Sequence, residues 1–244
     1  MLLTDREAHH AQHVLRLRRG ERITVLDGAG QEYLCEVQQC ERHRISLGLI
    51  ERRLQPAPAS RITLLQAVPK GKTMEAIIQK AAELGASRIV PLLSERVVPQ
   101  LEEKTGSHKL EKWRLAAIEA IKQCGSAWLP EIEAPLTPSQ SLARGEALEM
   151  SLIASLQVGS RPARDHFRAF HTRFGRMPHS VGVWIGPEGD FSPAETSLIE
   201  EHGALPITLG QLVLRTETAA IYCLSVISHE LLSSVSANSV PSSP

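Results

Sequence analysis

The sequence predicts an α/β protein with a small N-terminal β-barrel, and three patterns lead to this fold class. After residue 58, short apolar stretches alternate with helical stretches, as in proteins built on a mostly parallel sheet. Residues 21–50 instead show short alternating runs, which are typical of an antiparallel barrel. Residues 51–60 lose this periodicity and gain proline and alanine, which indicates a linker. We expect a β-barrel domain over residues 1–58, an α/β domain over 59–233 and a disordered tail over 234–244.

The strands of the barrel are predicted by alternation and by one turn signal. Ile23, Val25 and Tyr33 lie in short alternating runs, and residues 45–49 form another such run. Asp27-Gly28 is a dipeptide that favours a tight turn between strands.

The α/β domain is predicted by five apolar stretches and by the helical patterns between them. The expected strands are Ile62–Ala67, Arg88–Leu93, Ser151–Ser155, Val181–Gly186 and Leu205–Gly210. The expected helices are Thr73–Leu84, which has one apolar stripe and a glycine stop, about Lys109–Cys124, and an amphipathic helix within Gly159–Pro178.

The last two strands are joined and followed by helices. Ser192-Pro193-Ala194-Glu195 has the residues of a helix start, and Gly203 fits just past the end of that helix. Thr216 or Thr218 is expected to cap a final helix with one apolar face.

A ligand site is expected in the polar loops that follow these two strands, residues 187–190 and 211–219. In α/β sheets, ligands bind in the crevice beyond the carboxyl ends of the strands. Gly189 would permit a positive φ and close approach of a ligand.

Composition places the chain among globular proteins and excludes several classes. Of its 244 residues, 42% are hydrophobic and 22% charged, and no apolar run approaches a membrane span. No export signal is visible at the N-terminus, so we expect a cytoplasmic protein without a membrane partner. The net charge of +0 argues against a general polyanion or DNA binder. The four cysteines lack metal-ligand spacing and are expected to be reduced core thiols.

Other site motifs are absent or incomplete. Gly71-Lys72-Thr73 follows a strand and opens a helix, but a phosphate-binding P-loop needs glycine where Gln66 stands. Neither a Gly-x-Ser-x-Gly elbow nor a glycine-rich dinucleotide motif occurs. His9 and His13 lack a third ligand, so no metal site is expected.

Two C-terminal motifs resemble a known family. Ile185-Gly186-Pro187-Glu188-Gly189, and Leu209-Gly210 followed by Leu214–Ala219, are similar to the ribosomal-RNA uridine-N3 methyltransferases. Weaker resemblance extends over nearly the whole chain, for example at Lys70–Glu75, Gln79–Gly85 and Gln123–Gly125. The resemblance implies a trefoil-knotted (SPOUT-class) α/β methyltransferase domain behind a PUA-like barrel. It further implies S-adenosylmethionine as the methyl donor.

The resemblance also implies roles for individual residues. Arg215 is expected to stabilise the uracil anion, and Glu217 to orient the base or accept its proton. The implied cofactor-binding residues are Leu156, Ile185, Gly186, Pro187, Glu188, Gly189, Leu209, Gly210, Leu214, Thr216, Thr218 and Ala219. An ion pair between Glu188 and Arg215 is the alternative, purely structural role for these two side chains.

The expected partner is 16S ribosomal RNA, free or in the small ribosomal subunit. Its implied contacts are Arg16, Arg18, Arg19, Lys70, Lys72 and Arg96. The family further implies a homodimer, with the C-terminal helix as the contact.

The chain also departs from the family. Members often begin with a further strand ahead of the position of Met1, so we expect an incomplete barrel. Two cations that members often carry are absent, with Ser126 and Leu212 near their positions. The alternatives left open are a knotted methyltransferase acting on a ribose 2′-hydroxyl or on transfer RNA, and a noncatalytic RNA binder of ribosome assembly.

Overall fold

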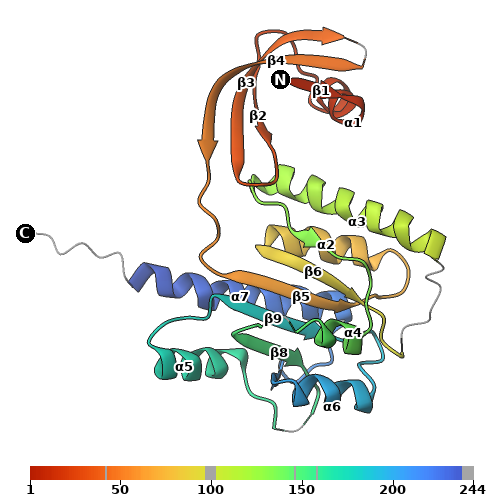
Figure 1. Ribbon diagram of the computed structural model, residues 1–244, viewed down its shortest axis with the longest axis vertical. Helices are drawn as coiled ribbons and strands as arrows, with labels where there is room; N and C mark the ends of the chain where they lie inside the picture. The colour runs from red at the N-terminus through yellow and green to blue at the C-terminus, as the bar shows by residue number, and fades with distance from the viewer. Residues whose placement is uncertain (42, 97–102, 146, 158, 238–244) are drawn as a thin grey trace, which may run out of the picture. The chain divides into compact units, whose positions relative to one another are not determined.

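The chain forms two compact units, shown in Figure 1. The computed structural model describes residues 1–41, 43–96, 103–145, 147–157 and 159–237. The first unit comprises Met1–Ala57 together with the short segment Gly125–Trp128, and the remaining residues make up the second. The domain boundaries expected from the sequence made no provision for Gly125–Trp128.

The first unit is an antiparallel sheet of four strands in the order β1-β4-β3-β2, which gives an open half-barrel. Asp27 makes the predicted turn, because its Oδ1 accepts hydrogen bonds from the N–H groups of Ala29 (2.7 Å) and Gln31 (3.0 Å). The linker expected at residues 51–60 begins later than predicted, since β4 continues to Leu54. The strands are β1 Leu2–Thr4, β2 Arg22–Leu26, β3 Gln31–Glu41 and β4 Arg44–Leu54.

Two short helical segments that the sequence did not predict cover this sheet. They are α1, Asp5–His9, and the π-helical η1, His10–Val14. Their alanines are buried with strand residues in a small core of Ala8, Ala11, Cys35, Val37, Ile45 and Leu47.

The segment Gly125–Trp128 completes the first unit by packing on Gly30. The Gly30 N–H donates to the carbonyl of Ala127 (2.9 Å), and the indole of Trp128 donates to the carbonyl of Pro56 (3.1 Å). A Cβ atom on Gly30 would lie 2.5 Å from the Trp128 ring, and Gly30 has a φ of +95°. Only glycine fits this position.

The second unit contains a parallel sheet in the order β10-β8-β9-β5-β6-β7. The five predicted strands are all present, and the two-residue β7 was not predicted. Their bounds are β5 Arg61–Ala67, β6 Ala86–Leu92, β7 Glu131–Ile132, β8 Met150–Ala154, β9 Ser180–Ile185 and β10 Ala204–Ile207. Together with the half-barrel, this sheet confirms the predicted α/β class. The knot stays a prediction.

Helices cover both faces of the parallel sheet, as alternating strand residues show. Leu64 of β5 and Val183 of β9 belong to a core shared with α2, α3, α5 and α7, whereas Leu65 and Trp184 face α6 and α4. The helices are α2 Thr73–Glu83, α3 Glu103–Cys124, α4 Pro138–Ala143, α5 Ala163–Phe174, α6 Pro193–Glu201 and α7 Thr216–Ala237.

The C-terminal helix differs from its prediction at its far end. Helix α7 continues to Ala237, so the first four residues of the expected disordered tail are helical. The rest of that tail, residues 238–244, lies outside the described residues. Within the described part of the chain, none of the helices has both the length and the apolar character needed to cross a membrane.

Candidate functional site

The carboxyl ends of β8, β9 and β10 meet the start of α7 at one pocket. These three strands are neighbours in the sheet, so the loops that follow them lie together. The lining residues are Ala154, Ser155, Leu156, Ile185, Gly186, Pro187, Glu188, Asp190, Leu209, Gly210, Leu212, Val213, Leu214, Thr216 and Ala219. Ten of the twelve predicted cofactor-binding residues are therefore brought together, and Gly189 and Thr218 are not among the lining residues.

The pocket has a sharp turn on one side, formed by residues 186–190. The Asp190 N–H donates to the carbonyl of Pro187 (2.9 Å), and Asp190 has a φ of +61°. Gly189 does not use the positive φ that a glycine permits, and Asp190 takes the left-handed conformation instead. An aspartate tolerates this conformation better than most residues, and here its Oδ1 also accepts from the N–H of Phe191 (2.8 Å).

Gly186 is required by a close approach within the same turn. A Cβ atom at Gly186 would lie 2.8 Å from Oδ1 of Asp190 and 3.0 Å from the backbone nitrogen of Phe191. A side chain at this position would push the turn away from the end of β9.

The hydroxyl of Thr216 joins the start of α7 to two strand ends. It donates to the carbonyl of Gly186 (2.7 Å) and accepts from the side-chain amide of Gln66 (2.9 Å). Thr216 was one of the two expected helix caps. The helix instead begins with Thr216 itself, and the carbonyl of Arg215 accepts the first turn's hydrogen bond from Ala219 (2.8 Å).

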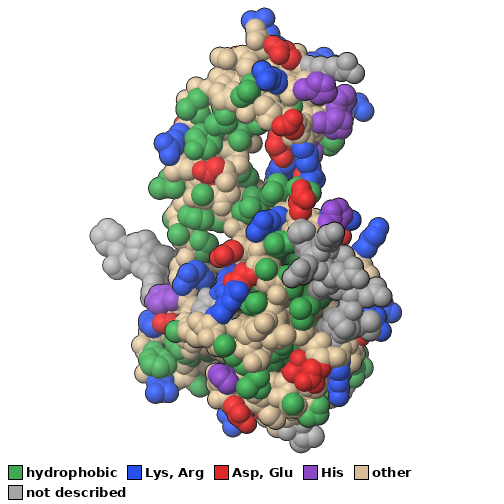
Figure 2. Space-filling model, turned by 45° about the vertical axis from the view of Figure 1, so that its right-hand side comes forward, with side chains coloured by type: hydrophobic (Ala, Val, Ile, Leu, Met, Phe, Trp, Pro, Cys, Tyr) green, Lys and Arg blue, Asp and Glu red, His purple; other side chains and the backbone are tan. Residues whose placement is uncertain are grey.

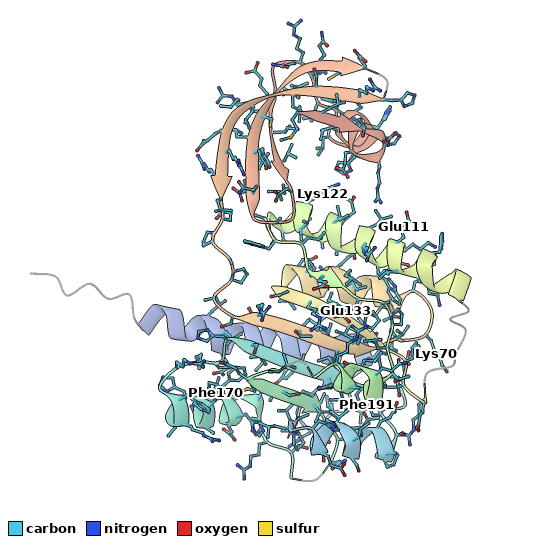
Figure 3. The ribbon with its side chains drawn as sticks, viewed as in Figure 1. Lys70, Glu111, Lys122, Glu133, Phe170 and Phe191 are labelled. Atoms are coloured by element: carbon cyan, nitrogen blue, oxygen red, sulfur yellow. The ribbon has the colours of Figure 1, made fainter. Side chains whose placement is uncertain are left out.

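Two of the predicted RNA-binding residues contact the same turn from neighbouring strands. The backbone N–H of Lys70, which follows β5, donates to the Glu188 carboxylate (3.1 Å). The guanidinium of Arg96, which follows β6, donates to the carbonyl of Gly189. The Glu188 carboxylate thus holds Lys70, and no ion pair with Arg215 occurs among the described residues. Figure 3 shows Lys70 and Phe191 on the side toward which β5 and β9 point, away from Phe170.

A buried carboxylate fixes the loop after β6. Glu195 of α6 is only 7% exposed, and it accepts from the hydroxyl of Ser94 (2.8 Å) and from the N–H of Glu95 (3.0 Å). It also completes the capping box of α6 with Ser192, as the sequence predicted. One carboxylate therefore ties the Arg96 loop to the helix that follows the 186–190 turn.

The predicted catalytic residues stand beside the pocket and do not line it. Leu214 and Thr216 are lining residues, whereas Arg215 and Glu217 alternate with them. Arg215 is exposed and Glu217 is half-buried. Among the described residues, neither side chain has a hydrogen bond or an ion pair, so both remain available to a substrate.

The other predicted RNA contacts lie on exposed surfaces of the two units. Arg16, Arg18 and Arg19 follow η1 in the first unit, and Lys72 precedes α2 in the second. On the face drawn in Figure 2, Lys and Arg side chains are interspersed with Asp and Glu side chains. A search of the described residues gives no group of three or more His, Cys, Asp or Glu side chains arranged to hold a metal ion.

Two family profiles match the chain and together cover most of it. The profile described as "RNA methyltransferase domain" matches residues 55–228, and "RNA methyltransferase PUA domain" matches residues 3–50. Ribosomal RNA small subunit methyltransferase E of Bacillus subtilis is 30% identical over 93% of this chain and 89% of its own length. The protein of that name from Synechocystis is 33% identical over 92% of this chain and 71% of its own.

The chain belongs to the ribosomal RNA small subunit methyltransferase E family.

Solved structures agree with this family in fold. Lpg2936 from Legionella pneumophila, solved in complex with the bound cofactor SAM, has a TM-score of 0.85 and 32% identity, and the match covers 94% of this chain and 91% of that one. A ribosomal RNA small subunit methyltransferase E from Neisseria gonorrhoeae, bound to S-adenosyl methionine, has a TM-score of 0.82 and 26% identity, with the same coverage.

The family motifs did not point to every residue in or next to the pocket. Gln66 entered the sequence analysis only as the residue that rules out a P-loop, and Asp190, Leu212 and Val213 were not named as ligand-binding residues. Asp190 follows Gly189 directly, so the turn signal Gly-Asp could have identified it. For Gln66, the only signal was a polar residue, besides Thr63, in the predicted strand Ile62–Ala67.

Proposed function

We propose that this protein transfers the methyl group of S-adenosylmethionine to N3 of a uridine in the 16S RNA of the small ribosomal subunit, in the cytoplasm. The observation that carries the proposal is the pocket itself. Ten of the motif residues that imply methyl-donor binding line it, and it lies beside Arg215, which has no hydrogen bond or ion pair within the described part of the chain.

The residues around the pocket fit S-adenosylmethionine. The close approach of Gly186 to Asp190 keeps the turn tight at the pocket, and Ile185, Leu209 and Leu214 offer apolar contact for an adenine ring. Glu188 and Asp190 place carboxylates at the rim, which suits a cationic ligand. When bound, the donor supplies a methyl group on a sulfonium, a good leaving group, so the protein needs no nucleophile of its own.

The protein's own task is to prepare the uridine. The N3 proton must leave, and the ring oxygens then carry negative charge that needs a cation nearby. Arg215 supplies this cation, and Glu217 orients the base or accepts its proton. Because N3 lies on the base-pairing edge, the uridine must be unpaired when it reacts. Lys70 and Arg96 contact the turn, and together with Lys72, which precedes α2, they contact the RNA backbone.

A second copy of the chain is proposed to cover the mouth of the pocket. Leu156, Leu212 and Val213 line the pocket but are 64%, 77% and 78% exposed, an unusual state for three neighbouring large apolar side chains. Tyr222 of α7 is 46% exposed as well. Burial of these side chains against a symmetry-related copy gives a homodimer.

Calorimetric titration with S-adenosylmethionine tests the donor site. Glu188→Ala changes a residue that lines the pocket, and Arg215→Ala changes a residue beside it. We expect binding by the wild type and weaker binding by Glu188→Ala. Methylation of small subunits that lack the modification, followed by mass mapping of the nucleoside, then tests the reaction. A methylated ribose or a methylated transfer RNA would assign another reaction, and absence of donor binding would leave only an RNA binder.

A further inference from the structure

Gln66 is a fully buried polar residue at the end of β5. Its exposed fraction is 0%, and it does not line the pocket. Its side-chain nitrogen donates two hydrogen bonds, to the carbonyl of Ala67 (2.8 Å) and to the hydroxyl of Thr216 (2.9 Å). The Gln66 side chain is thus linked to the pocket lining by its hydrogen bond to Thr216.

The direction of every hydrogen in this chain of contacts is determined. The carbonyl of Ala67 can only accept, so the Gln66 nitrogen, and not its oxygen, must face it. The hydroxyl of Thr216 accepts from that nitrogen, which leaves its own hydrogen for the carbonyl of Gly186 (2.7 Å). The three residues therefore form one directed relay from β5 through α7 to the turn after β9.

This arrangement has a cost in stability. The side-chain oxygen of Gln66 is buried and has no hydrogen-bond partner among the described residues. A buried carbonyl without a partner is unfavourable, and an apolar side chain of similar shape would avoid it. The stability of the fold alone therefore does not explain why residue 66 is a glutamine.

We propose that Gln66 is a positioning residue for the methyl-donor pocket, and this rests on the function proposed above. By holding the Thr216 hydroxyl, it fixes the carbonyl of Gly186 against the start of α7. The next residue, Pro187, has no N–H, so the relay through Thr216 is the hydrogen bond that orients this peptide group at the pocket. Without Gln66, the Thr216 hydroxyl keeps only its bond to the Gly186 carbonyl, so this carbonyl is held less firmly, while Lys70 and Arg96 still contact the rest of the 186–190 turn.

The test measures donor affinity and thermal stability in the full chain for four variants. Gln66→Met removes the side-chain amide that donates the hydrogen bond and keeps an apolar side chain of similar length. Thr216→Val removes the hydroxyl but keeps the shape of the side chain. The double variant combines them, and Thr216→Ser restores a hydroxyl. Ser151→Ala is the matched control, because it deletes a hydrogen bond from the Trp184 indole (3.0 Å) in the same sheet without lining the pocket.

A positioning role predicts that Gln66→Met weakens binding of S-adenosylmethionine about tenfold. The double variant should bind S-adenosylmethionine no more weakly than the single variant with the lower affinity, because the two side chains act through the same hydrogen bonds. Thr216→Ser should keep near wild-type affinity, and Ser151→Ala should lower the melting temperature without changing the affinity.

Two results would overturn the proposal while the donor site stands. They are wild-type affinity in Gln66→Met with only a lower melting temperature, and fully additive losses in the double variant. Failure of the wild type to bind the donor would instead overturn the proposed function, and this inference with it.

Discussion

Single residues around the pocket are explained by close contacts more than by conformational freedom. Gly186 is a glycine because Asp190 and Phe191 occupy the space of a Cβ atom, whereas its φ is not in the left-handed region. The positive φ belongs to Asp190, whose side chain accepts a hydrogen bond from the next residue. Motif matching identified the glycine, but only the folded turn supplies the physical reason.

Replacement of Gly186 by alanine is expected to weaken donor binding at least about tenfold, because the new Cβ must displace the backbone of the turn. Gly48→Ala is the matched control. Its Cβ would approach to 2.6 Å of a Gln38 side-chain atom, but that flexible side chain can move aside. Titration calorimetry on both variants checks this, and equal affinities would contradict it.

The cysteines are expected to fall into two classes of reactivity. Burial raises the pKa of the Cys223 thiol to about 12, and it also raises the pKa of Cys35. Cys40 and Cys124 are exposed, which corrects our expectation of four core thiols. Because the thiolate is the reactive form, a colorimetric thiol reagent at pH 8 should label two thiols quickly in the native protein and all four in denaturant.

At the scale of elements, the same capping rule succeeded at one helix and was not applied at another. Ser192 and Glu195 predicted the start of α6, and both capping bonds are present. Thr137-Pro138-Ser139-Gln140 carries the same pattern before α4, yet this helix was not predicted, since six residues give too short an apolar period. Helix starts can be found from side-chain chemistry where periodicity is too short to help.

These two capping boxes allow a matched comparison of stability. Glu195→Ala removes the capping bond and also the contacts to Ser94 and Glu95, so we expect a loss of about 2–4 kcal/mol in the free energy of unfolding. Thr137→Ala removes a capping box alone, and about 1 kcal/mol is expected. Urea unfolding measures both, and equal losses would show that the loop after β6 gains nothing from Glu195.

The contacts of Glu149 with Arg176 and His179, ahead of β9, are expected to stabilise the fold less in acid. Hydrogen bonds from Arg176, and then from the backbone of His179, lower the pKa of Glu149 from 4.5 to about 2. The folded state thus favours the charged carboxylate, so its contribution to stability is full above about pH 4.5 and is lost as the pH falls toward 2. The difference in unfolding free energy between wild type and Glu149→Gln should shrink over this window, and a constant difference would contradict the assignment.

At the scale of the whole molecule, a net charge of +0 limits how strongly RNA is attracted. The proposed contacts Arg16, Arg18 and Arg19 are exposed, but their cations are balanced by acids elsewhere in the chain. We therefore propose that shape and assembled surfaces contribute to recognition, with the small subunit rather than naked RNA as the substrate.

Arg18→Ala should lower the slope of log affinity against log salt by about one unit, since one phosphate contact is lost. Donor affinity should not change, because Arg18 lies in the first unit. Filter binding of small subunits at several salt concentrations checks the slope, and an unaltered slope would remove Arg18 from the RNA surface. Strong methylation of naked RNA without preference for the subunit would contradict the inferred substrate.

Prediction from sequence was complete where local patterns are long and incomplete where distant segments meet. The five main strands and the helix over Thr73–Leu84 follow from periodicity, and ten of the residues that line the pocket follow from motifs. Gln66 and Thr216 are 150 residues apart, so their hydrogen bond had no signature in either local pattern. The same holds for Trp128 and Gly30, which meet only in the folded first unit.

The contact between Trp128 and Gly30 limits where the chain can be cut into separate domains. The backbone passes between the two units after Ala57, after Cys124 and again after Trp128. A fragment ending at residue 57 therefore lacks the indole that fills the space over Gly30 and binds the carbonyl of Pro56. A truncated or hybrid protein that is cut at the linker alone would lack part of the first unit. Appending residues 125–128 would restore the Trp128 contacts.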